Sequence, residues 1–144
     1  AVRFPFVLGP GDYTRRLYFY VEHAVRRLPL YVDAPEAQLS FIHQADAGRF
    51  LAWLAAESPL TGPVNACCPG TASVADLLGY VRSRTGGSPL LCSGGAPAPY
   101  NGTPAHSLDT RRAQGAGFSF SPLQSWLPGL LDRCILEAQR GLQP

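Results

Sequence analysis

The sequence contains no lysine and no methionine, and all 12 of its basic residues are arginines. The absence of lysine excludes Schiff-base chemistry, the lysine of a phosphate-binding loop and lysine-assisted proton transfer within this chain. The formal net charge of +2 is too small to favour a nucleic acid or an anionic membrane, and we expect neither as a partner. Arginine suits carboxylates and phosphates, which its planar guanidinium can hold through two parallel hydrogen bonds.

Long apolar runs and paired cysteines are also missing. No segment approaches the roughly 18 apolar residues of a membrane span, and we identify no signal peptide with a basic head and an apolar core. The cysteines form no Cys-x-x-Cys pair and complete no zinc spacing with the histidines, so we expect no metal site. We expect buried free thiols and a cytoplasmic protein; the cysteines are Cys67, Cys68, Cys92 and Cys134.

What is present is the composition of a globular chain. The 144 residues are 46% hydrophobic and 15% charged, which is sufficient for one domain with a core. Strand patterns are predicted at 3–8, 30–32, 38–43, 63–67 and 88–92. Helical spacing of apolar residues follows the first, third, fourth and fifth of these strands, and a further short helix is expected at 110–114. This order is typical of an α/β protein.

Local signals predict where the helices begin. Asp12 or Thr14 is expected to cap the first helix, and Asp46 the second. Ser73 and Asp76 resemble a capping box at the start of the third. Residues 94–104, rich in proline, glycine and alanine, predict a surface loop.

Four segments, in order and spacing, resemble one family. Residues 3–12 read Arg-Phe-Pro-Phe-Val-Leu-Gly-Pro-Gly-Asp, and residues 38–46 read Gln-Leu-Ser-Phe-Ile-His-Gln-Ala-Asp. Val-Asn-Ala follows at 64–66, and Asp-Thr-Arg-Arg-Ala at 109–113 precedes Gly-Phe at 117–118. Together they resemble the carboxy-terminal half of the extended short-chain dehydrogenases/reductases, the NAD-dependent epimerase/dehydratase family.

The resemblance implies an α/β fold with the late strands and helices of a Rossmann-type sheet and the small C-terminal substrate-binding subdomain. Residues 1–144 would form a single unit. Within it, 1–28 and 38–57 would belong to the Rossmann part, and 29–37 and 58–144 mostly to the substrate subdomain.

The resemblance also implies which roles this chain can have. The family's glycine-rich dinucleotide loop and its Tyr-x-x-x-Lys catalytic pair are absent here, so we expect no catalytic residue and no cofactor bound to this chain alone. NAD or NADP would bind the intact parent. Phe4, Pro5 and Phe6 match the stretch beside the nicotinamide, although packing in the core is an equal alternative for the two phenylalanines. Gln38 and Ser40 match the substrate-lining segment.

Two departures from the family bear on the substrate. Leu39 stands where the family often has an arginine that grips a nucleotide-sugar diphosphate, and none of residues 97–106 is the second arginine expected there. A diphosphate would lose its strongest charge-assisted contacts without these side chains. The sequence therefore favours a smaller or less charged small-molecule substrate.

Two functional hypotheses remain open. In the first, the chain is the substrate-binding part of an NAD(P)-dependent epimerase/dehydratase or reductase, inactive without an N-terminal half that is its partner. An apolar strand at 3–8 with no neighbour supplied before it supports this expectation. In the second, it is a stand-alone, non-catalytic binding or oligomerisation domain that self-associates through an exposed sheet edge.

Overall fold

The computed structural model describes residues 1–95, 97–105 and 107–141. Short strands and helices follow one another, which confirms the α/β prediction. The strands are β1 (Val2–Arg3), β2 (Phe6–Leu8), β3 (Pro29–Leu30), β4 (Phe41–His43), β5 (Val64–Asn65) and β6 (Leu90–Leu91). The helices are α1 (Arg16–Arg26), α2 (Gln44–Ala56), α3 (Val74–Thr85), α4 (Arg111–Gly115) and α5 (Leu123–Arg140). Within the described ranges, none of these helices has the length and hydropathy of a membrane span.

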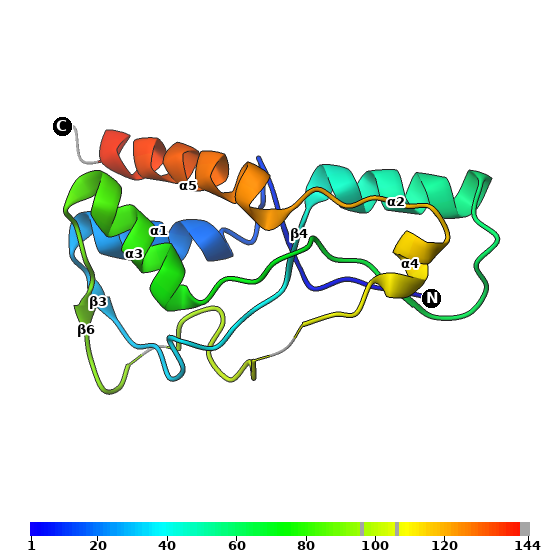
Figure 1. Ribbon diagram of the computed structural model, residues 1–144. Helices are drawn as coiled ribbons and strands as arrows, with labels where there is room; N and C mark the ends of the chain where they lie inside the picture. Colours follow the sequence, from blue (N-terminus) through cyan, green and yellow to red (C-terminus); the bar gives the residue numbers. More distant parts are fainter. Residues whose placement is uncertain (96, 106, 142–144) are drawn as a thin grey trace.

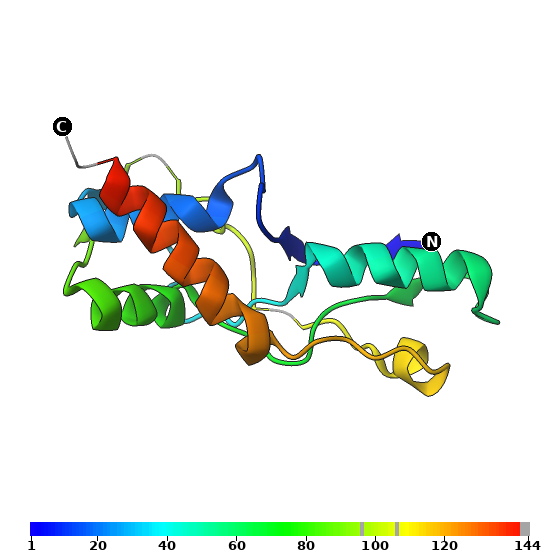
Figure 2. The ribbon, with the colours of Figure 1, turned by 90° about the horizontal axis from the view of Figure 1, so that it is seen from above.

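Two hydrophobic clusters lie toward opposite ends of an elongated molecule (Figure 1). The first cluster joins α1, α3 and α5, whose apolar stripes include the buried Tyr20, Val81 and Leu131. The second joins α2, β5 and the chain around α4, with Phe50 and Phe118 buried in it. Figure 2 shows α5 crossing α1 and α3, while α2 extends toward the other end. Helical spacing therefore predicts the faces of α1, α3 and α5 that build the first cluster, whereas on α2 the predicted stripe is only partly correct, since Phe50 is buried and Leu51 is 48% exposed.

The strands form three parallel pairs, β1 with β5, β2 with β4, and β3 with β6. Phe6 lies opposite Phe41 in the second pair. In the part of the chain that the structure describes, each strand has a single partner strand, and the Phe41 carbonyl of β4 also accepts the Cys68 amide at 2.9 Å. The first strand is split into β1 and β2 because Pro5, between them, has no N–H for a ladder hydrogen bond.

The predicted helix starts are correct at α3 and wrong at α1. Ser73 and Asp76 form the expected capping box, each side chain bonding the other's backbone N–H. At α1 the cap is Arg15, in the left-handed conformation with φ 50° and without a side-chain cap bond. Asp12 instead accepts hydrogen bonds from the Thr14 amide and hydroxyl, which stabilises the turn before the helix.

The predicted cap of α2 is also wrong. His43 is the cap, and its Nδ1 accepts the Ala45 amide at 3.2 Å. Asp46 lies in the first turn and is buried, where it accepts hydrogen bonds from the Arg49 guanidinium and from the amide and hydroxyl of Ser121. The carboxylate therefore joins α2 to the segment that precedes α5.

The segment predicted as a surface loop contributes to the first cluster. Ala98 and Tyr100 are 3% exposed, and the Tyr100 ring stacks against Tyr20 of α1. The prediction was wrong for these two residues because the composition that signals a loop does not show which side chains the loop returns to the core.

Three of the four cysteines are buried free thiols, as expected, but Cys92 is exposed. Burial raises the pKa of Cys68 to about 12 and that of Cys134 to about 11. These two side chains therefore stay protonated at neutral pH and act as small apolar groups in the core.

The predicted division into a Rossmann part and a substrate subdomain is not the same as the division into two clusters. Helix α1 packs with α3 and α5, although the family resemblance assigns residues 1–28 to the same part as 38–57. Packing alone assigns no function to either cluster, so the predicted boundaries stay a prediction.

Gly9 follows β2 and lies against Gln44, the first residue of α2. A Cβ added at Gly9 would overlap the Gln44 side chain. We expect Gly9→Ala to lower the free energy of unfolding by about 1 kcal/mol, because the Gln44 side chain must leave its position to avoid the overlap. Chemical denaturation would measure it.

A second substitution tests this cause directly. Gln44→Ala removes the overlapping atoms, so the double variant should regain most of the loss. Gly48→Ala is the matched control, since a Cβ there meets nothing within 4 Å and alanine favours the helix. An equal loss in the single and double variants would contradict the overlap.

Candidate functional site

The three residues predicted to contact a cofactor join β1 to β2. Phe4 packs against the second cluster and Phe6 against the first, so the structure divides the two rings between the two ends of the molecule. Phe4, Pro5 and Phe6 are all half-buried. Each therefore keeps an accessible part while contributing to packing, and their cofactor role stays a prediction.

Phe6 is part of an aromatic group with Phe41, Tyr20 and Tyr100. The ring centroid of Phe6 lies 4.6 Å from that of Tyr100 and 6.0 Å from that of Phe41. The Tyr100 amide donates a hydrogen bond of 2.9 Å to the Tyr20 hydroxyl, which fixes the loop to α1. The Arg16 guanidinium lies 5.8 Å from the Phe6 centroid, so a cation lies near this ring.

The two phenols of this group are poor candidates for proton transfer. Burial raises the pKa of Tyr20 to about 12, and burial followed by the neighbouring Tyr20 raises the pKa of Tyr100 further. Both phenols are therefore neutral at physiological pH. The Tyr100 hydroxyl is buried and has no hydrogen-bond partner among the described residues. Sequence reasoning missed Tyr100, for which an aromatic residue within the loop segment was the available signal.

The two residues predicted to line the substrate site differ in exposure. Gln38 is exposed, its carbonyl accepts a hydrogen bond from the Thr71 hydroxyl at 2.8 Å, and its side chain also hydrogen-bonds Asp76. Ser40 is 1% exposed, and its hydroxyl accepts the Leu108 amide at 3.3 Å. Ser40 therefore attaches the segment before α4 to β4, and any contact with substrate stays a prediction for both.

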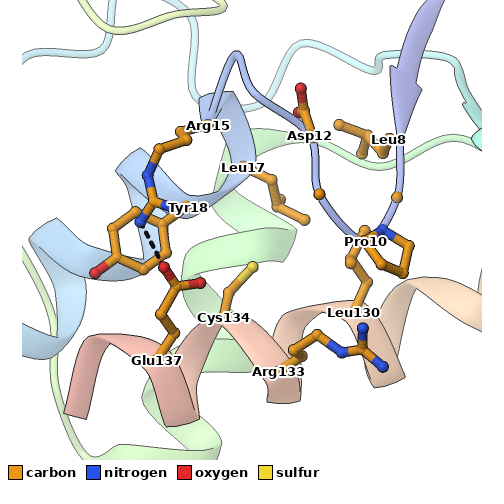
Figure 3. A pocket seen from close by; sticks show the side chains of 12 residues that line it. Leu8, Pro10, Asp12, Arg15, Leu17, Tyr18, Leu130, Arg133, Cys134 and Glu137 are labelled. Carbon is orange, nitrogen blue, oxygen red and sulfur yellow. Dashed lines mark hydrogen bonds and ion pairs between the residues drawn. The ribbon is translucent and has the colours of Figure 1, made fainter. Parts of the chain in front are cut away.

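A recess lies beside the turn between β2 and α1, where the turn faces α5 (Figure 3). The Arg15 guanidinium stacks on the Tyr18 ring at 3.8 Å and forms a 2.8 Å ion pair with Glu137 of α5. In Figure 3 the dashed line marks this pair, with Cys134 next to it on α5. None of the predicted site residues lines this recess.

The recess is too small for a substrate. Its volume is about 130 Å³, below the roughly 300 Å³ at which ligand pockets begin. The charges of Arg15 and Glu137 neutralise each other, and Asp12 is engaged by Thr14. The arrangement stabilises the turn against α5. Across the described ranges, no group of three or more metal-ligating side chains occurs either.

Comparisons with known proteins place this geometry in a known fold. No family model matches the sequence, and no curated protein matches it. Solved structures do match. MoeE5 in complex with UDP-glucuronic acid and NAD is 24% identical with a TM-score of 0.73, and this chain aligns over 99% of its own length and 47% of MoeE5.

The fold of this chain is shared with about half of MoeE5. Two more structures agree over 99% of this chain and 46% of theirs. TunA, an NAD-dependent NDP-hexosamine 5,6-dehydratase involved in tunicamycin biosynthesis, is 21% identical with a TM-score of 0.68. UDP-glucose 4-epimerase from Thermotoga maritima is 18% identical with a TM-score of 0.67. This chain thus spans about half the length of the structures it matches.

Proposed function

We propose that this chain is the substrate-binding portion of an NAD(P)-dependent epimerase/dehydratase or reductase and is inactive without a dinucleotide-binding half. The observation that carries the proposal is the alignment of 99% of this chain with about half of each of these three structures, at TM-scores up to 0.73. The four motifs at 3–12, 38–46, 64–66 and 109–118 support the same family. Fold alone does not define function, and these motifs add the family-specific part.

The strand edges support a partner half. β1 and β2 are parallel to their partners and pair along one edge only within the described chain. Parallel strands occur almost always in sheets covered on both faces and extended by further strands. Val7, in the middle of β2, is 42% exposed although apolar, which agrees with a missing covering layer. We infer that a preceding half would supply the adjoining strand.

The residues present fit one end of the cofactor only. Phe4 and Phe6 each keep part of the ring accessible in a different cluster, and the apolar face of either ring suits a nicotinamide. The sequence contains no Gly-x-Gly-x-x-Gly fingerprint, whose backbone amides would bind a pyrophosphate. Bound nicotinamide cofactor would supply the hydride transfer. This chain's own residues would provide the wall beside it, and the tyrosine and lysine that move the proton would lie in the other half.

The substrate is proposed to carry less charge than a nucleotide sugar. Leu39 occupies the position of a phosphate-gripping arginine and is 1% exposed in the first cluster, with its backbone hydrogen-bonded to Ala72. An arginine side chain oriented as that of Leu39 would place its guanidinium in this apolar cluster, where an unpaired charge is costly to bury. We therefore expect no phosphate-binding charge at position 39. The proposed substrate is therefore a small carbonyl or hydroxyl compound.

Cofactor titration tests the proposal that the pyrophosphate-binding site lies outside this chain. Titrating the isolated chain with NAD+ or NADPH up to about 1 mM should leave the fluorescence of Trp53 and Trp126 without a saturable change. Co-expression with the preceding half should restore binding and reductase or epimerase activity. Tight binding of either cofactor by this chain alone would contradict the proposed location of the pyrophosphate site.

The alternative is a stand-alone binding or oligomerisation domain with the same fold. The unpaired strand edges favour it as well, because two copies can pair along them. The length of the natural gene product distinguishes the enzyme hypothesis from the stand-alone-domain hypothesis. A product about twice as long as this chain, with a glycine-rich start, supports the enzyme; a product of these residues alone that sediments as a dimer supports the alternative.

A further inference from the structure

A second cavity lies between α3 and α5 and shares no lining residue with the recess or with the predicted site residues. Its volume is about 380 Å³, which falls in the range of small-molecule pockets. Leu77 of α3 and Leu127 and Leu131 of α5 give it an apolar floor, and all three are buried. Its polar lining residues are Thr71, Asp76, Tyr80 and Gln124.

The first acceptor comes from a proline inside α5. Pro128 has no N–H, so it cannot donate the helical hydrogen bond to the carbonyl of Gln124, four residues earlier. Both residues line the cavity, so the carbonyl that lacks its helical donor belongs to a lining residue. A backbone carbonyl without its helical donor is a strong acceptor for a ligand.

The second acceptor is the Asp76 carboxylate. The amide of Ser73, followed by its hydroxyl, holds the pKa of Asp76 below its ordinary value, so the group is an anion at neutral pH. The cap bonds use Oδ2, and the Gln38 side chain also donates a hydrogen bond to this carboxylate. The neighbouring Tyr80 hydroxyl donates to Asp132 at 2.9 Å and accepts from Arg84, which is itself paired with Asp132. The negative charge of Asp76 therefore has no paired cation within the described chain.

We propose that this cavity binds a small primary amine, with its apolar body on the leucines of α3 and α5 and its ammonium donating to the Gln124 carbonyl and the Asp76 carboxylate. An ammonium has three donors and no acceptor, which matches a wall that offers acceptors. The proposal stands independently of the oxidoreductase function, because it uses none of the residues assigned to that function.

Phenethylamine is the probe, and 2-phenylethanol, which has the same carbon skeleton without the charge, is its control. Titration of the methyl-labelled 144-residue chain should shift the resonances of Leu77, Leu127 and Leu131 saturably. The alcohol should bind at least about tenfold more weakly, since it lacks the charge-assisted hydrogen bonds. Absence of saturable shifts, or equal affinity for both compounds, overturns the proposal.

The source of the acceptor is tested with one substitution. Pro128→Ala restores the helical donor to Gln124, so it should weaken phenethylamine binding about tenfold while raising the melting temperature. Pro122→Ala removes a proline from the start of the same helix outside the cavity, and should leave the affinity unchanged. Asp76→Asn keeps an acceptor for the cap and should also weaken binding. Unchanged affinity in both Pro128→Ala and Asp76→Asn overturns the proposal.

Discussion

Truncating Phe50 to alanine is expected to lower the free energy of unfolding by about 4 kcal/mol, the range found for large buried aromatic side chains. Phe50 is completely buried in α2, and its ring centroid lies 5.8 Å from that of Trp53, 4.9 Å from that of Phe118 and 5.3 Å from that of Phe120. Since all three neighbours belong to the second cluster, the substitution would leave a cavity at the centre of that cluster.

The two clusters predict that the effect of Phe50→Ala on hydrogen exchange differs between helices. Because the first cluster joins α1, α3 and α5 without Phe50, hydrogen exchange should accelerate in α2 and α4 more than in those helices. Leu51→Ala, one residue along the same helix and 48% exposed, is the matched control and should cost less than about 0.5 kcal/mol. Equal acceleration throughout the described chain would show that the clusters unfold as one unit.

The Asp46→Asn substitution is expected to cost about 2 kcal/mol, because it replaces a buried charged acceptor, bonded by the half-buried Ser121 and the exposed Arg49, with a neutral amide. The carboxylate accepts hydrogen bonds from Arg49 at 2.7 Å and from the Ser121 amide at 2.6 Å, and the residue is 4% exposed. Asp109→Asn is the matched control. That carboxylate is on the surface and bonds only its neighbour Arg111, so the stability should not change measurably.

The contribution of Asp46 should depend on pH in one direction. Burial alone would raise its pKa, but the Ser121 amide and the Arg49 guanidinium outweigh burial and hold the pKa below the ordinary value. A carboxyl group whose pKa is depressed by folding stabilises the protein above its unfolded pKa. Its contribution is then lost as the pH falls through the folded pKa.

Denaturation from neutral to acidic pH measures this effect. The difference between wild type and Asp46→Asn should be constant above about pH 5 and shrink below about pH 4. A difference that grows on acidification would contradict the sign of the shift.

Much of the helical architecture follows from local sequence, and particular residues show why the remainder does not. Ser73 and Asp76 are three residues apart and bond each other, so spacing alone predicts that cap. Asp46 has the same local signal but is recruited by Ser121, which lies far along the chain, and His43 takes its place. The local preference of a side chain for capping is overridden when a donor from a distant segment hydrogen-bonds that side chain instead.

The candidate site is harder to predict because its parts meet only in three dimensions. Phe6 and Phe41 could be assigned to strands, but their contact depends on the register of β2 and β4. Tyr100 completes the aromatic group from a segment with the composition of a loop. Ser40 was predicted as a substrate residue, and its bond to Leu108 could not be read from either segment alone.

The parallel strand pairs also determine how the chain reaches this structure. Val2 pairs with Val64, Phe6 with Phe41, and Pro29 with Leu90, so each pair closes a long loop before it gains any ladder hydrogen bond. Such closures cost entropy early and make folding slow relative to a helical bundle of the same size. During that delay the helices form before the strands pair, and the unpaired strand edges are exposed to other chains. Refolding yield should therefore fall as protein concentration rises.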